Sequence, residues 1–479
     1  MISSSSTSEK QKAGFACLRS VDINASFYLH IFVKEGKTGY QPEYEYQKKT
    51  GAIKENQKGT GLLRSFWGGL QARQIMNTGY LFTLINLAVF LDTVLYGIIV
   101  PVVPYYATSV GASTTELGLI FAALSAGLLL ASVPAGLACD RYGYRPVMVL
   151  GMAGLTISTL IFIISRSVWL LVISRLLQGI AAAATWSAGL ALVAILYPPH
   201  LRGQKMGIVM TSTGLGTIIG PVLGGTLYQF AGYAFPFLVT AGAGALLTLL
   251  LWFSPLPRNS NPAGRQQPPW QQFLFNRNIF WVVLITVTGS FGFGMLEPLL
   301  PIDLQKRFGL GSAGVGLLFG ALSLSFALFQ PLFGILSDRL GRKPLIVAGL
   351  ISTAATVPWL VVAPNVKLVT ATMALLGLTT GAYSTPALPL LAESMEKIHP
   401  KHPTDGKTGQ ANGLYGTTYG IANTAYSVGL LAGPLVGTFL AQRWDVLTVM
   451  LLYSALLGAT AIGVMARLQE TLKAKKILS

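Results

Sequence analysis

One charged, glycine-containing segment occurs twice in this otherwise apolar chain. The sequence GLACDRYGYRP occupies Gly136–Pro146 and GILSDRLGRKP occupies Gly334–Pro344, which places Asp140 and Asp338 198 residues apart. Each copy lies between two long apolar segments. A turn repeated in this way indicates that a membrane-spanning unit has been duplicated within the chain.

The apolar segments are long enough to cross a bilayer. Hydrophobic residues make up 52% of the 479 residues and charged residues only 11%, whereas soluble domains carry about 25% charged residues. A helix needs about 20 apolar residues to span the hydrocarbon core. We therefore predict an all-α integral membrane protein with twelve transmembrane helices, at 80–104, 115–138, 146–165, 169–196, 206–228, 234–254, 279–301, 313–336, 344–363, 367–392, 411–440 and 446–467.

The distribution of the net charge of +17 indicates a membrane protein rather than a nucleic-acid-binding one. Eleven of the 34 Lys and Arg residues lie in the first 75 residues. If this segment is inside, seventeen others fall in inward loops and the C-terminal tail, and five in outward loops. Because basic residues concentrate on the cytoplasmic side, we expect both termini in the cytoplasm.

A linker rich in Pro, Asn and Gln separates six spans from six. We predict a disordered cytoplasmic tail, a six-helix bundle, a cytoplasmic linker, a second six-helix bundle and a C-terminal tail, at 1–78, 79–254, 255–278, 279–467 and 468–479. Pro101-x-x-Pro104 closes the first span and Pro298-x-x-Pro301 the seventh. Two pseudo-symmetric bundles of this kind are typical of secondary transporters, which hold substrate between them.

The repeated turn is expected to form a gate on the cytoplasmic side. Its carboxylates can hold neighbouring helix ends through charge-assisted hydrogen bonds, and breaking these bonds frees a bundle to move. A solvated basic loop that only sets topology is the alternative, and the duplication favours the gate. Tyr144 stands where the second copy has Arg342, which predicts a weaker network in the first copy. The predicted gate residues are Gly136, Asp140, Arg141, Gly143, Arg145, Gly334, Asp338, Arg339, Gly341, Arg342 and Lys343.

Glycine rows mark the fifth and eleventh spans. Glycines four residues apart leave a smooth strip on one helix face, and an internal proline kinks the helix. Close packing alone, or packing that also seals a cavity, accounts for this pattern. The residues concerned are Gly216, Gly220, Pro221, Gly224, Gly225, Gly429, Gly433, Pro434 and Gly437.

Ionisable residues inside the spans are the main candidates for a functional site. Asp92 lies near the middle of the first span and Glu297 in the outer half of the seventh. A charge at mid-membrane costs about 2.5–3.5 kcal/mol, so each should face a cavity or a partner. Such a carboxyl group can exchange a proton or pair with a cationic substrate; a structural salt bridge is the alternative. Arg175 and Gln178 in the fourth span either orient these acids or are purely structural.

Other site types lack their sequence signals. The four histidines, His30, His200, His399 and His402, lie in the tail and loops without an HExxH pattern, and there is no GxxxxGK[ST] phosphate loop. We therefore expect no enzyme, no metal site and no cofactor, and a proton gradient as the energy source.

These motifs resemble the major facilitator superfamily over about residues 80–467. The doubled turn is similar to its signature between spans 2 and 3 and spans 8 and 9, and RLLQG at Arg175–Gly179 to its fourth-span motif. GTIIGPVLGG at Gly216–Gly225 is similar to the motif of proton-coupled antiporters in the twelve-span drug exporter family. The resemblance implies a major facilitator fold and proton-driven export.

Within this group the chain is similar to vesicular amine and acetylcholine transporters. FLDTVLYGIIVPVVPYY, MLEPLLPI and GIANTAYSVGLLAGP resemble their spans 1, 7 and 11. The likeness implies that Asp92 and Glu297 handle substrate and protons, and that Glu393 matches an acid of their span 10, although its helix-end position favours a solvated acid. Asn423 stands where that group has Asp, and the short Ser109–Glu116 replaces its long lumenal loop. The tail is more similar to those of fungal drug and metabolite exporters.

We therefore predict a monomeric, proton-coupled antiporter that exports small organic molecules through the plasma membrane. Its partners are the substrate, protons and the bilayer. The predicted coupling residues are Asp92, Arg175, Gln178, Glu297, Glu393 and Asn423. A vesicular or vacuolar amine exchanger and a non-transporting sensor on the same fold are the alternatives.

Overall fold

The chain folds into helices that cross the membrane, as the apolar segments predict. The computed structural model describes residues 60–197, 199–254, 276–398 and 410–470, and within these ranges the regular structure is helical throughout. Twelve helices in the described part are long and apolar enough to span a bilayer. The predicted all-α, twelve-span architecture is confirmed.

The helices follow one another in two sets. The first set comprises α3 (Thr60–Ser109), α4 (Thr114–Tyr142), α5 (Tyr144–Ile164), α6 (Val168–Leu196), α7 (Pro199–Ala231) and α8 (Ala234–Phe253). The second comprises α10 (Arg277–Phe308), α11 (Ser312–Leu340), α12 (Arg342–Thr356), α13 (Trp359–Val362), α14 (Val366–Ile398), α15 (Gln410–Ala441) and α16 (Val446–Arg467). Residues 1–70 and 71–479 form two separate units, and the arrangement below concerns the second.

Some boundaries differ from the prediction. Helix α3 begins at Thr60, inside the predicted tail; the sequence has no proline between Pro42 and Pro101, so the helix can extend beyond the apolar segment. The ninth span is divided into α12 and α13 at Pro358, which lacks the N–H that a continuous helix needs. Residues 1–59, 255–275, 399–409 and 471–479, which hold most of the predicted tails and linker, lie outside the described residues.

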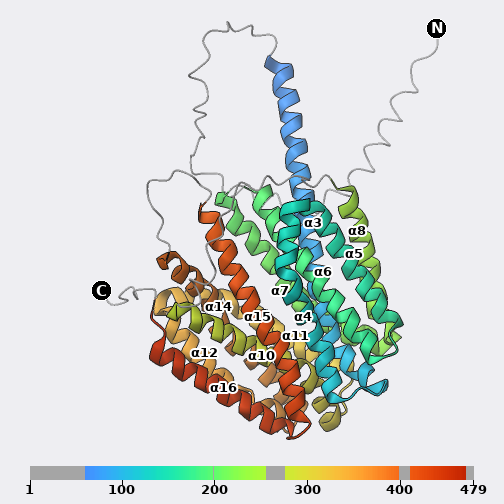
Figure 1. The fold of residues 1–479 in the computed structure, drawn as a ribbon, viewed down its shortest axis with the longest axis vertical. Helices are drawn as coiled ribbons and strands as arrows, with labels where there is room; N and C mark the ends of the chain where they lie inside the picture. Colours follow the sequence, from blue (N-terminus) through green and yellow to red (C-terminus); the bar gives the residue numbers. More distant parts are fainter. Residues whose placement is uncertain (1–59, 198, 255–275, 399–409, 471–479) are drawn as a thin grey trace, which may run out of the picture. The chain divides into compact units, whose positions relative to one another are not determined.

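The two sets meet chiefly along two pairs of helices, and α3 and α4 also contact α10. Figure 1 shows α5 and α8 at the right and α12 and α16 at the left, with α4, α7, α11 and α15 between them. Helix α7 of the first set packs against α11 of the second, and α4 of the first against α15 of the second. We call these two contacts the seam.

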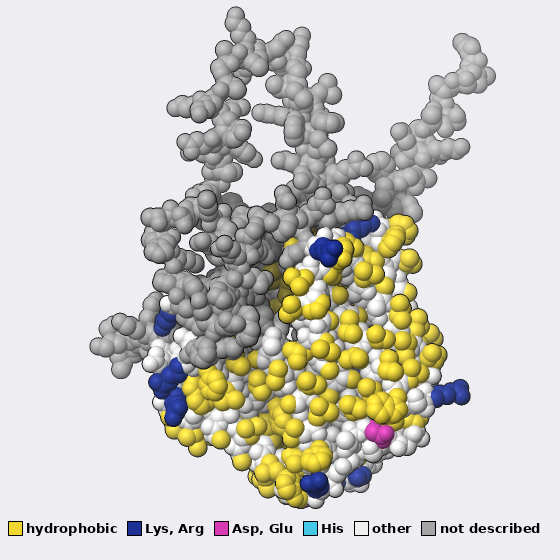
Figure 2. Space-filling view, in the orientation of Figure 1, with side chains coloured by type: hydrophobic (Ala, Val, Ile, Leu, Met, Phe, Trp, Pro, Cys, Tyr) yellow, Lys and Arg dark blue, Asp and Glu magenta, His cyan; other side chains and the backbone are white. Residues whose placement is uncertain are grey.

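The outer surface suits a hydrocarbon environment. Large apolar side chains such as Leu150, Ile164, Phe230 and Trp252 are exposed. Figure 2 shows hydrophobic side chains over the middle of one face, with Lys and Arg toward its edges. Exposed apolar surface of this extent is stable against lipid and unfavourable in water.

The glycine rows of the fifth and eleventh spans bring helices together within each set. A Cβ atom at Gly220 of α7 would lie 2.7 Å from the Val94 carbonyl of α3, and one at Gly433 of α15 would lie 2.2 Å from the Phe291 carbonyl of α10. Gly216, Gly224, Gly429 and Gly437 make equivalent close approaches to α3 or α10. The predicted close packing is confirmed, and it occurs in both halves.

We predict that Gly433→Ala destabilises the protein by about 1–3 kcal/mol, because the new methyl group overlaps the α10 backbone. The measurement is the thermal unfolding of the purified protein in detergent. Gly458→Ala is the matched control, because a Cβ there meets no atom within 4 Å of it in the described part. Equal melting temperatures for the two variants would contradict the packing argument.

Candidate functional site

The seam is closed at one end of the spans. We call the end at Gly143 and Gly341 the turn end and the end at Ser113 and Ser312 the far end. Near the far end, a Cβ at Gly118 of α4 would lie 2.0 Å from the Thr438 hydroxyl of α15. A Cβ at the equivalent Gly316 of α11 would lie 2.2 Å from the Pro221 carbonyl of α7. The two sets of helices therefore touch backbone to backbone at the far end.

Each of these two helix faces carries a further glycine toward the turn end. Gly136 lies 18 residues after Gly118, and Gly334 lies 18 residues after Gly316, which is about five helical turns and keeps each pair on one face. A Cβ at Gly136 or Gly334 would meet no described atom within 4 Å. The described close contacts of the seam at these glycines therefore lie at the far end.

Asp92 lies within the first set, midway along α3. It is 8% exposed, and its Oδ2 accepts a hydrogen bond of 2.8 Å from the indole N–H of Trp186 on α6. An indole can donate but not accept, so it stabilises the ionised carboxylate. Asp92 is thereby held by α6 and has no contact across the seam among its described hydrogen bonds.

Glu297 instead links the two sets. It is 2% exposed on α10, and its Oε1 accepts a hydrogen bond of 2.5 Å from the hydroxyl of Tyr96 on α3. Tyr96 is four residues after Asp92 and so shares its helix face. The two acids are therefore anchored from one face of α3, one through α6 and one across the seam.

Arg175 lies between the acids without an ion pair to either. Its side chain is 1% exposed and donates to Gln178 at 2.8 Å. Its guanidinium lies 5.9 Å from the ring centroid of Tyr96 and 5.8 Å from that of Phe121, and it interacts electrostatically with both Asp92 and Glu297.

Two buried donors of this arrangement have no acceptor among the described residues. These are Arg175 Nε and Gln178 Nε2. A buried donor without an acceptor is costly, so an acceptor that reaches this pair in another state of the protein would lower the free energy. We call Asp92, Tyr96, Arg175, Gln178, Trp186 and Glu297 the central cluster.

The second copy of the repeated turn carries an ion-pair network. Gly341 adopts a φ of 96°, and the next residue, Arg342, forms an ion pair with Glu393 of α14 and a second, at 3.5 Å, with Asp338. The backbone N–H groups of Arg342 and Lys343 donate to the carboxylate of Glu470, at 3.2 and 2.9 Å. All these contacts lie within the second set of helices.

The first copy lacks this network among its described side chains. Gly143 has a similar φ of 90°, but the buried Tyr144 occupies the position of Arg342. Arg145 donates to the carbonyl of Trp252 on α8, and Arg141 lies over the ring of Tyr142. The side chain of Asp140 lies outside the described set. The predicted asymmetry between the copies agrees with these contacts.

Two predicted coupling residues lie apart from the central cluster. Glu393 is paired with Arg342, so it belongs with the gate residues rather than with Asp92 and Glu297. Asn423 is exposed on α15 and has no described hydrogen bond. Glu393 lies away from the central cluster because it is near the turn end of α14, where it meets Arg342 of the repeated turn.

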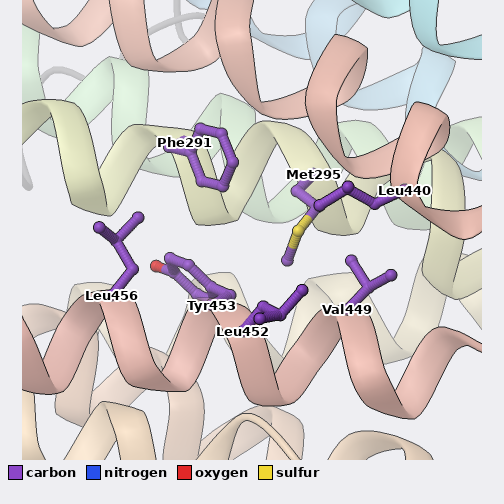
Figure 3. A pocket seen from close by; sticks show the side chains of 7 residues that line it. All are labelled: Phe291, Met295, Leu440, Val449, Leu452, Tyr453 and Leu456. Atoms are coloured by element: carbon purple, nitrogen blue, oxygen red, sulfur yellow. The ribbon is translucent and has the colours of Figure 1, made fainter. Parts of the chain in front are cut away.

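A small apolar pocket lies away from these residues. Figure 3 shows it between α10, α15 and α16, with a cavity volume of about 170 Å³. Its lining residues are Phe291, Met295, Leu440, Val449, Leu452, Tyr453 and Leu456. It contains no carboxylate and none of the predicted site residues, so it is not the candidate site.

Sequence reasoning missed Tyr96 and Glu470. A tyrosine in an apolar span is usually a packing residue, and only its spacing of four residues from Asp92 marked it. Glu470 follows the last span in a predicted tail, where an acid is ordinarily solvated.

The sequence is similar to transporters of known families. It aligns with the synaptic vesicular amine transporter of Bos taurus at 28% identity over 68% of this chain and 61% of that protein, so it spans less than two thirds of the amine transporter. It also aligns with the MFS-type transporter SLC18B1 of Rattus norvegicus, at 30% identity over 73% of this chain and 77% of that protein. A third relative is the uncharacterized MFS-type transporter C18.02 of Schizosaccharomyces pombe, at 27% identity over 79% of this chain and 93% of that protein.

Solved structures share the fold. A bacterial homolog of the human lysosomal transporter Spinster, in an inward-facing and occupied conformation, matches with a TM-score of 0.67 at 15% identity, over 81% of this chain and 96% of that one. The nucleoside transporter NupG matches with a TM-score of 0.63 at 13% identity, over 81% of this chain and 98% of that one. The family model described as Major Facilitator Superfamily matches residues 85–296 and 282–477. This chain belongs to the Major Facilitator Superfamily.

Proposed function

We propose that this transporter is a proton-coupled antiporter that exports small organic molecules from the cytoplasm by alternating access. The observation that carries the proposal is the central cluster, in which two buried carboxylates interact electrostatically with one buried arginine and one of them, Glu297, links the two sets of helices. Ionisable groups within the membrane are costly, and they mark proton and substrate pathways.

The chemistry follows from the different anchoring of the two acids. Asp92 and Glu297 each accept a single hydrogen bond within the described residues, which leaves acceptor capacity for a substrate cation or a proton. Arg175 supplies the countercharge for whichever carboxylate is ionised. A cationic group and a proton would thus compete for the same sites, which is the basis of exchange.

The basic residues of the loops support a cytoplasmic position for the turn end, under the positive-inside rule. The close contacts of the seam at the far end support an inward-facing state. We propose a monomer in the plasma membrane, driven by the proton gradient without a cofactor.

We predict that Asp92→Asn and Glu297→Gln each abolish proton-dependent export. The measurement is the accumulation of a panel of lipophilic cations and neutral toxins in an exporter-deficient host, with and without a protonophore. Asp303→Asn is the matched control, because Asp303 lies toward the far end of α10 and is paired with Arg307 at 2.7 Å. Export that persists in both neutralised variants would overturn the proposal.

We predict that Arg342→Gln destabilises the second set of helices by about 1–3 kcal/mol, because it removes the ion pairs of Arg342 with Glu393 and Asp338. This predicted loss of stability is smaller than for a fully buried ion pair, because the Glu393 side chain is 27% exposed. Thermal unfolding measures the effect. Arg339→Gln, an exposed neighbour without an ion pair in the described part, should be close to neutral, and an equal loss would argue against the network.

A vesicular or vacuolar amine exchanger is the second candidate. The match to the synaptic vesicular amine transporter and the pairing of Asp92 with an aromatic donor favour a cationic amine as substrate. The location of a tagged protein separates the two candidates: a surface location supports export, and an intracellular membrane supports amine loading.

A further inference from the structure

Two tyrosine hydroxyls of α3 donate hydrogen bonds to the second set of helices. Tyr96 donates to Glu297 at 2.5 Å, and Tyr105 donates to the backbone carbonyl of Leu310 at 2.7 Å. Both bonds join the same two sets of helices. They differ in the acceptor, since the carbonyl keeps its charge at every pH and the carboxyl group does not.

The strength of the Tyr96 bond depends on the proton of Glu297. A hydroxyl bonded to an ionised carboxylate forms a charge-assisted hydrogen bond, about twice as strong as a neutral one. Glu297 is 2% exposed, and Tyr96 is its one hydrogen-bond partner among the described residues. A proton on Glu297 therefore weakens a contact between the two sets, and no described group replaces it.

The other ionisable groups near Glu297 do not form this link. Arg175 reaches it from α6 and Tyr426 from α15, both through longer electrostatic interactions, and Tyr383 of α14 faces Tyr426. Tyr453 of α16 bonds to the Thr288 carbonyl. The ionisable residues of α4 and α11 lie at the ends of those helices.

The ring of Tyr96 is held in place independently of its hydroxyl. The guanidinium of Arg175 lies 5.9 Å from its centroid, a cation–π distance. Replacing Tyr96 by Phe therefore removes the hydroxyl and keeps the ring contact.

We propose that Tyr96 is a positioning residue that transmits the protonation state of Glu297 to the seam. Ionised Glu297 holds α3 against α10 through the Tyr96 hydroxyl, and proton uptake loosens this link so that the two sets can change their separation. The inference rests on the proton exchange proposed above, and it requires no knowledge of the substrate to be tested.

The test measures the separation of the two sets as a function of pH. Spin labels are placed on Tyr142→Cys and Leu340→Cys, which are exposed, equivalent positions at the turn ends of α4 and α11, with Cys17 and Cys139 replaced by Ser. Pulsed electron–electron distance measurements on the full chain in lipid nanodiscs compare the otherwise wild-type protein with Tyr96→Phe, Tyr105→Phe and Glu297→Gln.

We expect a pH-dependent change of distance in the wild type that is lost in Glu297→Gln. In Tyr96→Phe its midpoint should move by about one pH unit, a tenfold change in proton binding. The direction is toward higher pH, because the variant loses a bond that favours the ionised carboxylate. Tyr105→Phe should keep the wild-type midpoint. In the Glu297→Gln background, adding Tyr96→Phe should cause no further change in the measured distances. If the hydroxyl had a purely structural role, its removal would change the distances in this background too.

The outcomes separate this inference from the proposed function. A wild-type midpoint in Tyr96→Phe, with the transition still abolished by Glu297→Gln, would overturn the role of Tyr96 and leave proton exchange standing. An equal shift in Tyr105→Phe would also overturn it, because that hydrogen bond has no titratable acceptor. The absence of any pH dependence in the wild type would overturn both.

Discussion

The arrangement depends on the free energy of placing charge inside a membrane. A single ionised side chain at mid-membrane is costly, and this chain places Asp92, Arg175 and Glu297 in buried positions in its interior. Their burial is tolerable because each has a polar or aromatic partner, and because the two acids share one cation between them. The cost is lowest when one charge is neutralised, which is why the cluster suits proton exchange and cation binding.

The glycine rows make this cluster possible by bringing the helix backbones close together. Gly220 and Gly433 allow α7 to pack on α3 and α15 to pack on α10, so that the residues of α3 and α10 can meet at the seam. Gly118 and Gly316 then close the far end at equivalent positions of the two halves.

Much of the fold was predictable from the sequence because its signals are local. Apolar length predicts the twelve spans, although several helices extend beyond the predicted ends and Pro358 divides the ninth span. The duplicated turn predicts two halves. Asp92, Glu297 and Arg175 were predictable because an ionisable residue in a span has few structural explanations. The contact of Tyr96 with Glu297 was not predictable, because it depends on the relative height of α3 and α10, which no local pattern fixes. The pairing of Glu393 with Arg342 depends in the same way on the levels at which α14 and α12 end.

The most direct test of the account is whether Asp92 and Glu297 exchange protons. Infrared difference spectra of the purified protein, taken between about pH 5 and pH 9, report carboxyl groups that gain a proton, without any substrate. The account predicts protonated-carboxyl bands in the wild type that are reduced in Asp92→Asn and in Glu297→Gln and absent in the double variant. Identical spectra for the wild type and the double variant would show that these carboxyl groups keep one charge state, and would contradict the account.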